Sequence, residues 1–340
     1  MSRRVLVIGG TGFLGHRIAE AFVLAGDHVA VLTRGRSGRG GLDSVERLTA
    51  DRREPLAMHE LLQNRAFDVV VDNIAYEAED VRITLAALPK DTGHYLVTSS
   101  TAVYADRYVR RPLQERDADL EARAPFDAPD PFHSRQGHAY ANNKRAAEQE
   151  TSKSTIPWTV LRPPVILGED DRTRRVWWFV QRLLDRRAIL IPDWGPGRVF
   201  QVAWANDVAR AFVHAAGNPH AFGQAYNVAQ AELYTAESWI EAAAAILGVK
   251  ASYAHIPEAD LDKAGLNGYL LPVAGRPFGH LLVDTAAIRC QLNFEPAPEQ
   301  VWLAQTLRGC LANPPTIDSA GYDRRDQESR VATFAHARVK

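Results

Sequence analysis

The chain has 340 residues, of which 46% are hydrophobic, and its formal net charge is −1. This length is enough for one α/β domain plus a smaller appended lobe, and the near-neutral charge argues against nucleic acid or a membrane as a partner. The two cysteines form neither a disulfide framework nor a metal site, the N-terminus carries no charged-then-apolar leader, and no apolar run is long enough to span a bilayer. We therefore expect a cytoplasmic protein without a bound metal.

The first regular stretch, residues 4–19, predicts a strand, a tight turn and a helix. Gly9 permits the turn, Gly12 lets backbone N–H groups approach a pyrophosphate at the helix N-terminus, and Gly15 lets the helix pack closely on the strand. The spacing indicates a dinucleotide site, although a glycine-rich turn without a ligand is the alternative. Three more residues of the turn are predicted to contact the cofactor: Thr11, Phe13 and Leu14.

The second predicted strand, 28–32, ends in a basic segment. An NAD-binding fold would carry an acidic residue here for the ribose 2′-hydroxyl, whereas Arg34 and Arg36 offer guanidinium donors that suit a 2′-phosphate. The sequence thus predicts NADP(H) as the preferred cofactor, with NAD(H) as a second option. The alternative is that both arginines are solvated loop residues.

Strands and helices then alternate up to residue 162, which predicts a doubly wound parallel sheet. Because ligands lie beyond the carboxyl ends of such strands, Asn73, Ser100 and Pro163 are predicted at the cofactor edge. Asp51 could accept a hydrogen bond from the adenine amino group, or simply end a turn. The further predicted strands are 47–51, 67–73, 94–100 and 158–162, and the helices are 55–63, 77–88 and 139–152.

The predicted nucleotide-binding domain covers residues 1–165 and includes a long charged loop, 105–138, over the active site. Residues 166–312 are predicted to form most of a substrate-binding lobe, from which residues 200–230 return to the first domain. A polar tail, 313–340, follows and carries a predicted helix at 328–337. Further helices are predicted at 174–185, 206–216 and 236–247.

The catalytic prediction is based on Tyr140 and Lys144, which share one face of a helix at i and i+4. A neighbouring ammonium stabilises the phenolate of Tyr140 and brings its pKa toward neutrality, and Lys144 can also hold the nicotinamide ribose. Ser100 would hydrogen-bond the substrate oxygen for hydride exchange. The ten tyrosines and six lysines of the chain would give about 0.2 such pairs by chance.

Substrate contacts are predicted more weakly, from residues near this edge and from the second half of the chain. Trp177 and Trp178 could line a pocket, with hydrophobic packing between lobes as the alternative for at least one of them. Two further candidates are Tyr76 and Thr101, while His133 and His138 could have a substrate role or be ordinary loop residues.

Taken together, these motifs resemble the extended short-chain dehydrogenases/reductases, which include the NAD-dependent epimerase/dehydratase family, over roughly residues 4–310. The resemblance implies a Rossmann-type fold with Ser100, Tyr140 and Lys144 as catalytic residues. It also makes a homodimer one expected form of assembly. Three segments, Thr-Arg-Gly at 33–35, Ala-Asp-Arg-Arg at 50–53 and Pro-Pro-Val-Ile-Leu-Gly at 163–168, are similar to those of a bacterial branch loosely related to plant stem-loop RNA-binding proteins and to reductases. The motifs are Gly-Gly-Thr-Gly-Phe-Leu-Gly at 9–15, Ser-Ser-Thr-Ala-Val-Tyr at 99–104, Tyr-x-x-x-Lys at 140–144, Leu-Arg-Pro-Pro at 161–164 and Asn-Asp-Val-Ala at 206–209.

Departures from the family pattern narrow the expected reaction. Thr101 and Ala102 stand where sugar-nucleotide dehydratases carry an Asp-Glu pair, which disfavours dehydration. We expect an NADP(H)-dependent oxidoreductase that interconverts a ketone and a secondary alcohol on a small polar metabolite. The alternatives are an epimerase of a sugar or sugar nucleotide that retains its cofactor and a non-catalytic RNA-binding relative.

Overall fold

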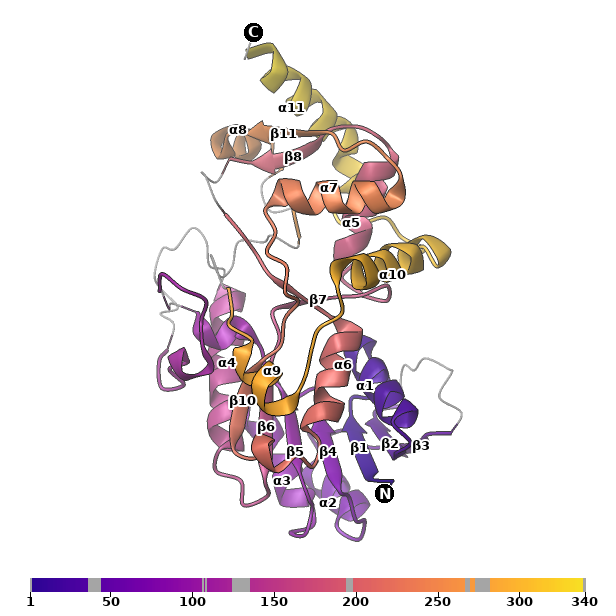
Figure 1. The fold of residues 1–340 in the computed structure, drawn as a ribbon, viewed down its shortest axis with the longest axis vertical. Helices are drawn as coiled ribbons and strands as arrows, with labels where there is room; N and C mark the ends of the chain where they lie inside the picture. The colour runs from indigo at the N-terminus through magenta and orange to yellow at the C-terminus, as the bar shows by residue number, and fades with distance from the viewer. Residues whose placement is uncertain are drawn as a thin grey trace. The chain divides into compact units, whose positions relative to one another are not determined.

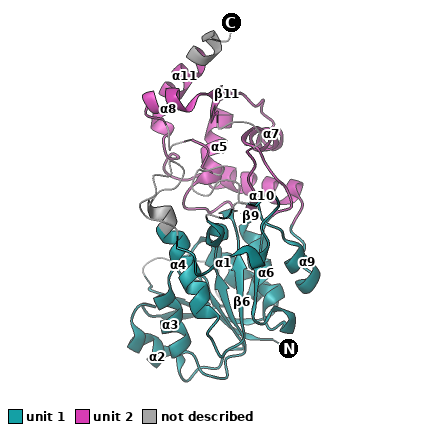
Figure 2. Ribbon diagram, turned by 90° about the vertical axis from the view of Figure 1, so that its left-hand side faces the viewer, with its two compact units in different colours: residues 1–166, 203–229, 277–296 teal, residues 167–202, 230–276, 297–340 magenta. Residues whose placement is uncertain are grey.

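The computed structural model describes residues 2–35, 44–105, 107, 109–123, 135–193, 198–266, 270–272 and 282–338, without the side chains of 135–138 and 334–338. Its contacts divide the chain into two compact units, which Figure 2 colours separately. Unit 1 consists of Met1–Ile166, Ala203–Ala229 and Pro277–Pro296, and unit 2 of Leu167–Val202, Gln230–Arg276 and Ala297–Lys340.

Unit 1 is built on a parallel sheet, which has seven strands within the described residues (Figure 1). The strand order β10-β6-β5-β4-β1-β2-β3 confirms the predicted doubly wound, Rossmann-type α/β fold. Its central strands are continuous apolar runs because both faces of the sheet are covered. The strands are β1 (Arg4–Ile8), β2 (His28–Thr33), β3 (Glu46–Thr49), β4 (Val69–Asp72), β5 (Tyr95–Thr98), β6 (Trp158–Arg162) and β10 (Gln224–Asn227).

Helices cover the two faces of this sheet, and a separate hydrophobic core lies under each set. On one face, α1 (Phe13–Leu24), α6 (Ala205–Ala215) and α9 (Ala286–Leu292) bury residues such as Ile18 and Phe22, which are one helical turn apart. The other face is covered by α2 (Pro55–Leu62), α3 (Ala78–Ala87) and α4 (Arg135–Thr151). The carboxyl ends of the strands are thereby left for the site.

The sequence-based prediction missed or misplaced several parts of unit 1. The strand β10 was not predicted, because it is short and polar and pairs with β6 from far along the chain. Helix α4 starts at Arg135, so the long predicted loop, 105–138, ends earlier than expected, and it contains the 3₁₀ helix η2 (Glu115–Asp117). Residues 277–296 belong to unit 1, although the sequence assigned them to the second lobe.

Unit 2 has its own aromatic core, in which the ring centroids of Trp239 and Trp302 stack 6.0 Å apart. The segment predicted as a tail belongs to this unit: α11 (Arg325–Arg338) carries Glu328, whose buried carboxylate pairs at 2.7 Å with Arg182 on α5 (Arg175–Leu184). This unit also contains the helices α7 (Ala236–Leu247), α8 (Glu258–Lys263) and α10 (Glu299–Ala312), and its strands β8 (Ile189–Pro192) and β11 (Tyr253–Ile256) form a parallel pair.

The described residues also contain short elements. Strands β7 (Val165–Leu167) and β9 (Val202–Trp204) lie where the chain passes between the units, and further described 3₁₀ helices are η1 (Thr101–Tyr104), η3 (Pro219–Ala221) and η5 (Tyr322–Arg324). None of the described helices combines the length and the apolar composition needed to cross a bilayer. Likewise, no group of three or more metal-binding side chains is gathered among the described residues.

Candidate active site

The glycine turn between β1 and α1 is fixed by close backbone contacts. Gly9 has φ +81°, and a Cβ there would lie 2.7 Å from Ile74. A Cβ on Gly15 would lie 2.1 Å from the carbonyl oxygen of Gly9, so only glycine lets α1 approach the strand this closely. Both glycines are thus required by the fold itself.

Gly12 differs, because nothing inside the protein excludes a side chain from it. It is the N-cap of α1, with φ −79°, and an added Cβ would meet only the Gly9 carbonyl oxygen, at 3.7 Å. No side chain caps this helix end, and its unpaired N–H groups and positive dipole suit a phosphate. The turn therefore fits the pyrophosphate of a dinucleotide.

The neighbours of Gly12 contribute in different ways. Thr11 and Phe13 are half-buried, whereas the side chain of Leu14 belongs to the hydrophobic core. Leu14 can therefore contact the cofactor only through its backbone N–H, whereas Thr11 and Phe13 remain candidates with their side chains as well.

At the adenine end, Arg34 follows β2 and is exposed, whereas Arg36 lies outside the described residues. Asp51 is half-buried and accepts a hydrogen bond from the backbone N–H of Arg53 at 3.1 Å. That bond closes a turn, and it leaves a carboxylate oxygen for a ligand, so both interpretations of Asp51 remain open.

Lys144 lies at the centre of the candidate site, although it is only 2% exposed. Its ammonium donates to the carbonyl oxygens of Ala75 at 2.8 Å and Thr98 at 2.9 Å, which follow β4 and end β5. Burial lowers the pKa of Lys144 to about 8, and the negative charges of Asp72, Glu148 and Asp80 partly offset this shift. The two carbonyls account for two of the three ammonium protons, so one is available to a ligand oxygen.

Two aromatic rings flank this ammonium. The Nζ atom of Lys144 lies 5.8 Å from the ring centroid of Tyr140, one turn earlier on α4, and 4.9 Å from that of Tyr76. Tyr140 is 37% and Tyr76 50% exposed, so both rings are accessible from solvent. The predicted pairing of Tyr140 with Lys144 on one helix face is present in the structure.

Ser100 comes two residues after the carbonyl of Thr98 that Lys144 binds. It is the N-cap of η1, and its hydroxyl accepts the backbone N–H of Ala102 at 3.1 Å. Because this contact uses an oxygen lone pair, the hydroxyl proton can be donated to a substrate oxygen. Ser100 and Lys144 thus lie at the same strand end.

The other residues predicted at this edge are involved in its framework. The side-chain oxygen of Asn73 accepts the hydroxyl of Thr98 at 3.1 Å. The buried Thr101 donates its backbone N–H to the carbonyl of Pro163 at 3.0 Å, which joins the ends of β5 and β6. Asn73 and Pro163 thus lie at the predicted edge.

Other predicted residues are not part of this cluster. Trp178 is buried in unit 2, where the guanidinium carbon of Arg182 lies 3.8 Å from its ring centroid, and Trp177 belongs to the same unit. A ring buried in this way cannot contact a substrate, and its contact with Arg182 lies within unit 2 rather than between the lobes. His133 and the side chain of His138 lie outside the described part of the chain.

The sequence analysis missed one part of the site, the buried Glu148. It follows Lys144 by one turn of α4, and its carboxylate accepts the hydroxyl of Ser99 and pairs with Arg162. The signal was available, because Tyr140, Lys144 and Glu148 are spaced i, i+4, i+8 on one helix.

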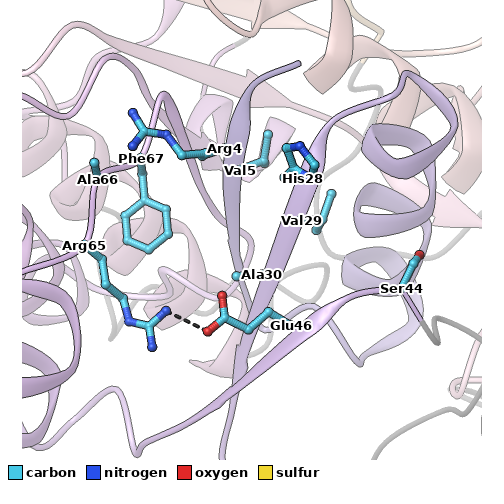
Figure 3. A pocket seen from close by; sticks show the side chains of 10 residues that line it. All are labelled: Arg4, Val5, His28, Val29, Ala30, Ser44, Glu46, Arg65, Ala66 and Phe67. Carbon is cyan, nitrogen blue, oxygen red and sulfur yellow. Dashed lines mark hydrogen bonds and ion pairs between the residues drawn. The ribbon is translucent and has the colours of Figure 1, made fainter.

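A hollow of about 430 Å³ lies at the other end of the sheet, among the amino ends of its strands (Figure 3). Its two arginines are already paired: Arg65 with Glu46 at 2.7 Å and Arg4 with Asp68 at 3.2 Å. Neither guanidinium is therefore left unneutralised for an anionic ligand. Lys144, by contrast, contacts the carboxyl ends of β4 and β5. Ligand sites of such sheets form at the carboxyl ends, so the hollow is not part of the candidate site.

Two curated proteins are similar in sequence. The chain is 28% identical over 255 residues to the chloroplast stem-loop binding protein of 41 kDa b from Arabidopsis thaliana, an alignment of 71% of this chain and 62% of the plant protein. It is 34% identical over 99 residues to 2′-dehydrokanamycin reductase from Streptomyces kanamyceticus, which covers 29% of this chain and 28% of the reductase. The chain thus matches less than two thirds of either relative.

Among solved structures, UDP-glucose 4-epimerase from Thermotoga maritima superposes with a TM-score of 0.69 at 16% identity, over 92% of this chain and 100% of that one. At this identity the likeness concerns the fold alone. The sequence description of the NAD dependent epimerase/dehydratase family, a family of NAD(P)-dependent enzymes, matches residues 5–229, which contain β1, the glycine turn, Ser100, Tyr140 and Lys144. The chain therefore belongs to the NAD-dependent epimerase/dehydratase family.

Proposed function

We propose that this protein is an NADP(H)-dependent oxidoreductase that interconverts a ketone and a secondary alcohol on a small polar metabolite. The observation that carries the proposal is the buried ammonium of Lys144, held by the carbonyls of Ala75 and Thr98 beside the exposed ring of Tyr140. When bound, the nicotinamide would supply or accept the hydride. The protein has to hold the substrate oxygen and move one proton.

Tyr140 would be that proton donor and acceptor. The nearby cation of Lys144 favours the phenolate form of Tyr140, and the third ammonium proton of Lys144 would bind a ribose hydroxyl. Ser100 would donate its hydroxyl proton to the substrate oxygen and so orient it toward Tyr140. Tyr76, whose ring centroid lies 4.9 Å from the ammonium, would contact the substrate.

The cofactor would lie along the carboxyl ends of the strands. Its pyrophosphate would occupy the space left by Gly12 at the N-terminus of α1, and the exposed Arg34 would bind the 2′-phosphate. The similarity to a protein named as a reductase supports the reductase reaction, although it extends over only 99 residues. A cytoplasmic location and a homodimer remain predictions.

The family name supports a second candidate, an epimerase of a sugar or sugar nucleotide that retains its NAD(P) cofactor. The two candidates differ in how the cofactor behaves: a reductase exchanges it in every cycle, whereas such an epimerase purifies with it. An assay of both oxidised and reduced nicotinamide cofactor released from the denatured, purified protein distinguishes them.

The test is NADPH turnover with a panel of carbonyl compounds, in the wild type and in Tyr140→Phe. We expect NADPH to bind both proteins alike and Tyr140→Phe to lose about 100-fold or more in kcat, because it lacks the proton donor. Equal turnover by the two proteins would reject Tyr140 as the acid/base. Binding of structured RNA that weakens with salt, without NADPH binding, would instead favour a function like the one named for the plant relative.

A further inference from the structure

A second buried charged group lies on α4, one turn beyond Lys144. The carboxylate of Glu148 is 3% exposed and faces the guanidinium of Arg162, itself 4% exposed, at the end of β6. Arg162 donates to both oxygens: Nε lies 3.0 Å from Oε1, and Nη2 lies 2.5 Å from Oε2. The hydroxyl of Ser99 donates to the same carboxylate. Three backbone segments, α4 and the ends of β5 and β6, therefore meet at one ion pair.

Each member of this group adjoins a residue of the candidate site. Ser99 precedes Ser100, and Glu148 follows Lys144 by one turn. Arg162 precedes Pro163, whose carbonyl fixes the backbone of Thr101. A shift of the ion pair would therefore displace Lys144 on α4 and Ser100 after β5, two of the proposed catalytic groups.

Arg162 is itself held from the other side. Its Nη1 atom donates to the hydroxyl of Tyr104 and to the carbonyl of Glu115, both at 2.9 Å, and the hydroxyl of Tyr104 donates to Asn227 at 2.7 Å. Apolar residues can often replace a buried ion pair without loss of stability, so the fold alone does not require these charges. Their directional bonds do fix distances between the segments, which apolar packing does less strictly.

We propose that Glu148 and Arg162 are positioning residues that act through Lys144, by holding α4 in register with the ends of β5 and β6. In this register the ammonium of Lys144 rests on the carbonyls of Ala75 and Thr98, and its remaining proton is available for the ribose. The proposal rests on the proposed function for its ligand, NADPH, but not for its geometry.

A double-mutant cycle on NADPH affinity tests this proposal. We expect Arg162→Lys, which keeps the charge but loses the two-pronged contact, to weaken NADPH binding by roughly 3- to 30-fold. The double variant Glu148→Leu/Arg162→Leu removes both charges and should weaken NADPH binding to a similar extent. In a Lys144→Met background neither change should weaken binding further, because the residue through which they act is gone. The same fold-loss in both backgrounds would overturn the proposal.

Two controls separate this role from stability and from the cofactor assignment. The matched variant Arg182→Leu/Glu328→Leu removes a buried pair in unit 2 and should leave NADPH affinity unchanged. Acylation of lysines followed by mass spectrometry reads the position of Lys144 without any cofactor. At a temperature well below the melting transitions of both proteins, Arg162→Lys should raise labelling of Lys144 several-fold, while the exposed Lys153 on the same protein stays constant.

If the wild type does not bind NADPH, the proposed function fails, and the labelling alone decides the positioning role. Unchanged labelling of Lys144 in Arg162→Lys would then overturn it.

Discussion

At the scale of single residues, we propose that Arg34 sets the preference between the two cofactors. This arginine is exposed at the end of β2, where it can reach a 2′-phosphate without breaking a contact of the fold. Arg34→Ala should weaken NADPH binding by about 10- to 100-fold, the worth of one charge-assisted contact, and NADH binding by less than about 2-fold. Calorimetric titrations of both cofactors measure this difference. Arg65→Ala, at the opposite end of the sheet, is the control, and equal losses for both cofactors would contradict the assignment.

Two glycines of one turn should respond differently to the same substitution. In Gly15→Ala the new methyl group collides with the backbone of Gly9, so the melting temperature should fall by roughly 3–10 °C. Gly12→Ala makes only an ordinary contact, 3.7 Å from the Gly9 carbonyl oxygen, and should melt within about 2 °C of the wild type. Its methyl group would occupy the space proposed for the pyrophosphate, so NADPH affinity should fall nonetheless. Wild-type affinity in Gly12→Ala would show that the pyrophosphate binds elsewhere.

At the scale of elements, buried His94 ties three segments together before β5. Its Nδ1 accepts the N–H of Gly217 at 3.0 Å, so the proton is on Nε2, which donates to Thr159 on β6 at 2.9 Å. Burial lowers the pKa of His94 to about 4, from an ordinary value near 6.5. Because the unfolded chain takes up the proton first, stability is lost as the pH falls from 6.5 towards 4.

The expected loss is about 2 kcal/mol in the free energy of unfolding between pH 7 and pH 5. Urea unfolding at the two pH values measures it. His94→Asn keeps an acceptor for Gly217 but cannot be protonated, so its unfolding should depend less on pH by about that amount. His28→Asn, an exposed histidine at the start of β2, should retain the wild-type dependence. A pH dependence in His94→Asn equal to that of the wild type would contradict the assignment.

The elements also show how far the sequence could predict this fold. Strands such as β4 and β5 are continuous apolar runs, so their local pattern identifies them. By contrast, β10 depends on a distant partner: the N–H of Asn227 is satisfied by the carboxylate of Glu115, 112 residues away, and no local pattern reveals this. The site divides in the same way. The spacing on α4 predicted the pairing of Tyr140 with Lys144, but not the burial of Lys144 on two backbone carbonyls from separate strands.

At the scale of the whole molecule, the last residues of the chain are expected to stabilise unit 2. Glu328 is fully buried between Arg182 and Arg325, with which it makes contacts of 2.7 Å. Glu328→Gln would leave two buried guanidinium groups without their shared carboxylate, a change that typically costs about 3–5 kcal/mol. We expect the melting temperature of unit 2 to fall by roughly 10 °C.

Tryptophan fluorescence reports this transition well, because five of the seven tryptophans belong to unit 2. The control is Asp326→Asn on the same helix. The side chain of Asp326 is 85% exposed where it pairs with Arg187, so this variant should lose no more than about 1 kcal/mol in the free energy of unfolding. Equal melting of the two variants would show that the buried cluster does not hold this segment. Because Glu328 and the proposed NADPH contacts belong to different units, Glu328→Gln should still bind NADPH normally at 20 °C. A parallel loss of binding at that temperature would mean that the two units unfold as one cooperative body.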